Sequence, residues 1–130
     1  MGKTRKPHGL EKLYCARIAR EAAEVVARAH SISVAEILSK DRARARVVYA
    51  RQMAMYLSHV VGQLSLGQVS HEFGRDRTTV GYSCNAIEDR RDGPFFDKEI
   101  AGLECELRGR LTSLLTCDVG APAPLRAAGD

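Results

Sequence analysis

The chain has 130 residues, 45% of them hydrophobic and 28% charged, which is enough for one modest core and leaves little room for a second domain. Its net charge of +4 hides an asymmetry, because residues 1–51 carry 12 Lys and Arg against 5 Asp and Glu, whereas residues 52–130 carry 8 against 11. No stretch has the apolar length of a signal-peptide core or a membrane span, so we expect a cytoplasmic protein whose basic half faces phosphates.

The spacing of apolar residues predicts an all-α fold, a small bundle of five to six helices, with no segment that alternates as a strand would. Residues 1–9 form a basic tail, expected to be disordered, that either adds weak affinity for phosphates or has no function. A long amphipathic helix is expected over residues 10–29. Its buried stripe would consist of Leu10, Leu13, Ile18, Ala22, Val25 and Val26. Ser33 would cap a short helix over residues 33–38, with Val34, Ile37 and Leu38 facing inward.

A basic connection precedes the next helix, which is expected over residues 46–62. Residues 41–51 read DRARARVVYAR and contain Arg42, Arg44, Arg46 and Arg51. Alternate arginines ahead of a helix make a cationic strip that can neutralise phosphates or reach into a narrow minor groove. The alternative is a solvated loop without a ligand.

Residues 65–73 and 76–90 are expected to form two helices that a glycine separates. Gly74 would stop the first helix, and Asp76 would cap the second, with Arg77, Thr78 and Thr79 in its first turn. This order is that of a helix-turn-helix, in which the first residues of the second helix meet base edges. Arginine can bind guanine, threonine can contact a thymine methyl, and aspartate can accept from cytosine. An ordinary helical hairpin is the alternative interpretation.

Two strings, residues 51–57 (RQMAMYL) and residues 73–80 (FGRDRTTV), resemble the C-terminal DNA-binding domain, domain IV, of the bacterial replication initiator DnaA. The resemblance extends from about residue 18 to about residue 90. It implies a helix-turn-helix that reads the major groove of double-stranded DNA and a basic loop that contacts the minor groove and backbone. The residues expected to contact DNA are Arg42, Arg44, Arg46, Arg51, Gln52, Ser65, Leu66, Arg75, Asp76, Arg77, Thr78, Thr79 and Tyr82.

The chain departs from the family pattern in ways that bear on the target sequence. The loop arginines lie one residue away from the usual spacing, so which of them would enter the groove is left open. A single Gly74 stands where the family has two glycines, and Arg77 replaces a histidine. After Val80, residues 81–83 read GYS instead of the family's LHA. Because arginine is longer, permanently charged and bidentate, the recognised site is expected to differ from that of the initiator.

The last predicted helix covers residues 95–116, and a Pro- and Ala-rich tail over residues 117–130 is expected to be disordered. Its apolar stripe consists of Phe96, Ile100, Leu103, Leu107, Leu111 and Leu114. The stripe is expected to pack on the domain's own core, and the alternative is a partner helix or self-association. The 4 cysteines and 4 histidines are too scattered for a zinc site. Neither a cofactor nor an enzymatic activity is expected, because no phosphate-binding loop or catalytic constellation occurs.

These patterns favour a sequence-specific, double-stranded DNA-binding protein of the bacterial nucleoid that acts as a transcription factor. Its arrangement resembles the DNA-binding half of gene-transfer-agent activators, in which a separate sigma-like region contacts RNA polymerase. One alternative is a replication regulator that competes with the initiator for its boxes at the origin. Another is a helical interaction module with vestigial DNA binding.

Overall fold

The protein forms a bundle that is all helical over residues 9–41 and 43–118, the residues described by this computed structural model. The helices are α1 (Gly9–His30), α2 (Val34–Leu38), α3 (Ala45–Val60), α4 (Leu66–Phe73), α5 (Arg77–Arg90) and α6 (Pro94–Asp118). The predicted all-α fold is confirmed, and the predicted helices end within two residues of the observed ones. The predicted tails lie outside the described residues, except that residue 9 belongs to α1 and residues 117–118 belong to α6.

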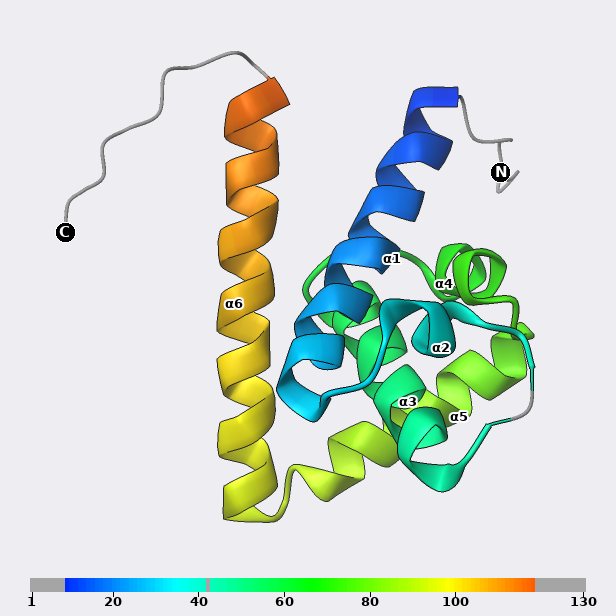
Figure 1. The fold of residues 1–130 in the computed structure, drawn as a ribbon, viewed down its shortest axis with the longest axis vertical. Coiled ribbons are helices and arrows are strands. Elements are labelled where there is room, and N and C mark those ends of the chain that lie inside the picture. The colour runs from blue at the N-terminus through cyan, green and yellow to red at the C-terminus, as the bar shows by residue number, and fades with distance from the viewer. Residues whose placement is uncertain (1–8, 42, 119–130) are drawn as a thin grey trace, which may run out of the picture.

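Helix α3 is the centre of the bundle and contacts α1, α2, α4 and α5 (Figure 1). Its second half is buried on every side, from Met53 to Ser58. A helix that is apolar all round has to be enclosed by other elements, so the remaining helices are arranged about this one. The side chain of Phe73 at the end of α4 and that of Val80 in α5 are also fully buried, so the helix-turn-helix is anchored on the same core.

The buried stripe predicted for α1 is correct in its second half and wrong at its start. Ile18, Val25 and Val26 are fully buried, whereas 68% of Leu13 is exposed. The first turns of α1 extend beyond α2, α3, α4 and α5 (Figure 1), so these helices do not cover an apolar side chain there. The predicted burial of Leu10 concerns a side chain outside the described set.

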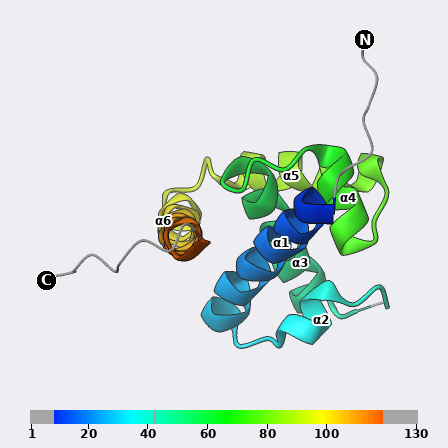
Figure 2. The same ribbon diagram turned by 90° about the horizontal axis from the view of Figure 1, so that it is seen from above.

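Helix α6 runs along one side of the bundle and packs on α1 (Figures 1 and 2). Ile100, Leu103 and Leu107 of the predicted stripe are buried. The expectation that this stripe packs on the domain's own core is therefore confirmed for its central residues.

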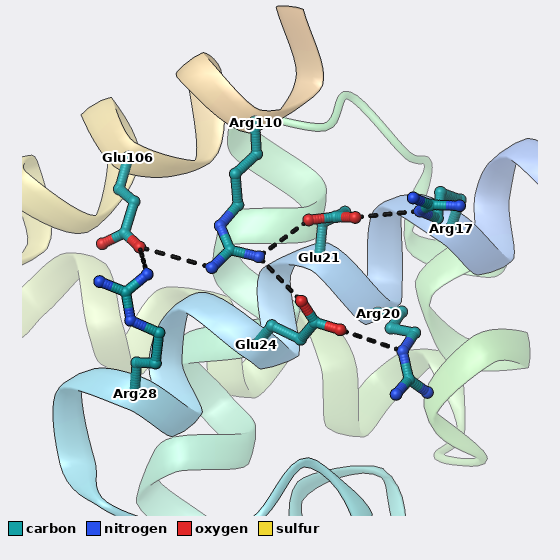
Figure 3. A network of polar contacts seen from close by, with 7 residues as sticks. All are labelled: Arg17, Arg20, Glu21, Glu24, Arg28, Glu106 and Arg110. Atoms are coloured by element: carbon teal, nitrogen blue, oxygen red, sulfur yellow. Dashed lines mark hydrogen bonds and ion pairs between the residues drawn. The ribbon is translucent and has the colours of Figure 1, made fainter. Parts of the chain in front are cut away.

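A network of ion pairs joins α1 to α6 (Figure 3). Arg110 donates to Glu21 at 3.0 Å and to Glu24 at 2.8 Å, and Arg28 lies 2.9 Å from Glu106. Burial alone would raise the pKa of Glu21, but the hydrogen bonds from Arg17 and Arg110 outweigh it, so the pKa lies below its ordinary value. Glu21 therefore holds α6 through its charged form.

Candidate nucleic-acid interface

The α4–turn–α5 unit has the local chemistry that the sequence predicted. Ser65 and Gln68 form a reciprocal capping box at the start of α4. Gly74 ends α4 with a φ of 64°, a left-handed conformation that favours glycine, and its N–H donates to the carbonyl of Ser70. Asp76 accepts a hydrogen bond from the Thr79 N–H at 2.9 Å, which lowers the pKa of its carboxyl group and fixes the start of α5.

The first two turns of α5 present polar side chains to solvent. Arg77, Thr78 and Thr79 are exposed, and 69% of Tyr82 is exposed. Since Tyr82 lies four residues after Thr78, the two share one face of the helix. Val80, Cys84 and Ile87 on the opposite face are buried, so α5 is anchored along one side and free along the other.

A hollow of about 390 Å³ lies between α5, α3 and the segment that precedes α3. Its lining includes Lys40, Val48, Gln52, Arg75 and Thr79. The structure thus brings Gln52 and Arg75, two of the predicted DNA contacts, beside the first turn of α5. Beside the carboxylate of Asp41, the lining carries cationic and hydrogen-bonding groups, which can bind a phosphate backbone.

Arg51 was expected to contact DNA, and in the structure its side chain binds backbone carbonyls of α2. Only 4% of this residue is exposed, and its guanidinium donates from Nε to the Ile37 carbonyl at 2.9 Å and from Nη2 to the Glu36 carbonyl at 2.8 Å. These carbonyls belong to the last turn of α2, where carbonyl groups lack N–H donors from a following helical turn. Burial, together with nearby Arg75, lowers the pKa of Arg51. Arg51 therefore joins α2 to α3 through these hydrogen bonds, and it also lines the hollow.

The described arginines of the basic connection lie against different parts of the structure. Arg44 is exposed at the N-cap of α3 and lines a second hollow, of about 280 Å³, that shares Asp41 and Ala43 with the first. Arg46 donates to the His30 carbonyl at 2.7 Å and stands about 200° round the helix from Val48. It faces α1 and is not beside Arg44, while Arg42 lies outside the described residues. Of the described loop arginines, Arg44 thus lines a hollow that adjoins the candidate interface.

The start of α4 borders α5 on the other side. Leu66 lies there, and a Cβ atom added to Gly81 would stand 4.0 Å from its Cδ1 atom. Leu66, a predicted contact, therefore lies beside α5 at Gly81, and Ser65, also a predicted contact, precedes it as the N-cap of α4.

Two exposed residues at this interface were not singled out in the sequence. Asn85 is exposed and lies seven residues after Thr78, so it extends the face of α5 by a further turn. Helical spacing from Thr78 would have identified it. Lys40 lines the hollow. No local pattern marks Lys40, because its surroundings are created by the distant residues 74–79.

Within residues 9–41 and 43–118, no three His, Cys, Asp or Glu side chains gather as a metal site would require. No helix in the same part of the chain combines the length and apolarity needed to cross a membrane.

Comparison with known proteins agrees with this geometry. A family model described as the bacterial DnaA protein helix-turn-helix matches residues 20–87, more than half of the chain. A chain in a crystal structure of a DNA replication initiation factor has 27% sequence identity to this protein and a TM-score of 0.70. The match covers 78% of this chain and 31% of that one. This chain thus corresponds to less than a third of the length of that protein. The protein belongs to the bacterial DnaA helix-turn-helix family and is a DNA-binding domain of that type.

Proposed function

We propose that this protein is a sequence-specific regulator that binds double-stranded DNA and controls transcription. Helix α5 would enter the major groove, and the connection before α3 would contact the minor groove or the backbone. The observation that carries the proposal is the exposed first turn of α5, where Arg77, Thr78 and Thr79 project from a helix start held by Asp76. In helix-turn-helix proteins these positions meet base edges, and binding, not catalysis, is their task.

The position of α6 supports a role in recruiting other proteins. Both views place α6 on the side of the bundle away from the start of α5 (Figures 1 and 2). DNA held by α5 would leave α6 accessible to RNA polymerase or to a sigma-like activator subunit. In this respect the protein resembles the DNA-binding half of gene-transfer-agent activators, and it would act in the cytoplasm, on the nucleoid. A second copy of the chain is another partner that this side could accept.

Similarity to a replication initiation factor favours a second candidate function. In that case the protein would compete with the initiator for its boxes at the origin. Mapping the sites bound across the genome separates the two candidates. Promoters among the bound sites support transcriptional control, whereas sites clustered at the origin support the replication role.

Selection of bound duplexes from a randomised pool tests the sequence specificity. If Arg77 binds a guanine, Arg77→Ala should cost about 1–3 kcal/mol of binding free energy and relax the preference at one base pair. If Arg77 binds a phosphate, all sites should weaken nearly equally. Arg108→Ala removes an exposed arginine from α6 and serves as the matched control. A parent protein that selects no motif would refute sequence-specific binding.

A further inference from the structure

The side chain of Lys40 lies across the turn of the helix-turn-helix. A Cβ atom added to Gly74 would stand 2.5 Å from Cε, 2.8 Å from Cγ and 2.9 Å from Cδ of Lys40. These separations are shorter than any van der Waals contact between carbons, so the lysine stem fills the space that another residue would need at position 74. The contact joins two segments that are far apart in the sequence.

Polar contacts reinforce the same junction. Arg75 donates from Nη1 to the Gly74 carbonyl at 3.2 Å and from Nη2 to the Ser39 carbonyl at 3.4 Å. The Ser39 hydroxyl accepts from the Asp41 N–H at 3.0 Å, and the Ser70 hydroxyl donates to the Arg75 carbonyl. Residues 39–41, which begin the basic connection, are therefore held against the turn that precedes α5.

This junction lies between two parts of the interface. On one side the basic connection continues to Arg44, and on the other side the turn continues to Arg77 and α5. Successive base pairs lie about 3.4 Å apart along a duplex, so a movement of a few ångströms between these parts would shift one contact by a whole base pair.

We infer that Lys40 is a positioning residue that fixes the spacing, in base pairs, between the core sequence read by α5 and the flank contacted by the basic connection. The inference rests on the proposed function, because it requires both parts to bind one duplex. The stem of the lysine performs this task by packing on Gly74, and its charge is not needed for it. A simple phosphate contact through the ammonium group would depend on the charge instead.

The test compares Lys40→Ala, which removes stem and charge, with Lys40→Met, which keeps an unbranched stem without the charge. The full-length parent first selects its core and flank from randomised duplexes. Binding is then measured on duplexes in which the flank is moved by one base pair in either direction. The parent and Lys40→Met should bind the shifted duplexes about tenfold more weakly, a loss comparable to one mismatched base pair. Lys40→Ala should bind shifted and unshifted duplexes within about twofold of each other, because it loses this constraint.

Three results would overturn the inference. Lys40→Ala could keep the parent's preference for one spacing, Lys40→Met could lose it together with Lys40→Ala, or the parent could select a core without any flank. If the parent selects no core at all, the proposed function itself fails, and this outcome is distinct from the other three. Circular dichroism of the variants checks that the fold is retained, which is expected because Lys40 is exposed.

Discussion

Leu107→Ala tests whether α6 packs on the core of the domain or leaves its apolar stripe free to bind a partner. Leu107 is fully buried between α6 and α1, beside the buried residues Ile100 and Leu103. Removing a buried leucine side chain costs about 2–5 kcal/mol, and the cost falls when neighbours can close the cavity. Because α6 lies at the edge of the bundle, it can shift toward α1, and we expect a loss of about 3 kcal/mol in the free energy of unfolding.

A loss of this size is a large part of the roughly 5–15 kcal/mol that stabilises a typical domain. It corresponds to a fall in Tm of about 10 °C for a chain of this size. Urea denaturation followed by circular dichroism measures it. Cys105→Ala is the matched control, because Cys105 is exposed on the same helix, and it should change stability by less than about 0.5 kcal/mol.

The two variants should bind DNA equally well at temperatures at which both are folded, since α6 lies away from the start of α5 (Figure 1). A Leu107→Ala protein as stable as the control would show that α6 is not packed on α1 in solution. In that case the stripe would be free for a partner, and the assignment of α6 to the core would be wrong.

Three further predictions concern other parts of the molecule. Gly62→Ala should lower the free energy of unfolding by about 1–3 kcal/mol, because the added methyl would stand 2.4 Å from a side-chain carbon of α1. At Gly102 an added methyl meets nothing within 4 Å, so Gly102→Ala should raise the free energy of unfolding by up to about 1 kcal/mol. Urea denaturation midpoints test both predictions. Because the pKa of Glu21 is lowered in the folded protein, the stability that Glu21 confers is complete above its ordinary pKa of 4.5 and is lost as the pH falls through the folded value. Glu21→Gln should therefore flatten this part of the profile of unfolding free energy against pH. An unchanged profile would contradict the assignment. In the native protein a maleimide should modify exposed Cys105 and spare Cys84, because burial shields that thiol and raises its pKa to about 11; mass spectrometry that finds Cys84 modified as quickly would refute its burial.

Features set by neighbouring residues were predictable from the sequence. Ser33, Gly74 and Asp76 begin or end helices as predicted, because each acts on backbone groups only a few residues away. The apolar periodicity of α4 and α5 likewise identified the buried face that anchors the helix-turn-helix.

Features that depend on distant residues could not be predicted in the same way. Arg46 and Arg51 belong to a basic run, but each is directed to carbonyls 14–16 residues earlier in the chain. Charge alone does not reveal which arginines a protein uses for its own backbone. The exposure of Leu13 has a similar cause, because helical periodicity shows which residues share a face but not where the neighbouring helix ends.

The proposed function assigns target choice and recruitment to separate parts of the molecule. Arg77 lies within the region that matches the family, whereas α6 follows residue 87, where that match ends. The start of α5 and helix α6 also lie on opposite sides of the bundle (Figure 2), with the buried core of α1 and α3 between them. Sites so far apart, with no shared contacts, usually contribute additively to the free energy. Substitutions at Arg77 should therefore change which DNA is bound without altering recruitment by α6. Substitutions on the exposed side of α6 should alter recruitment and leave the selected DNA motif unchanged.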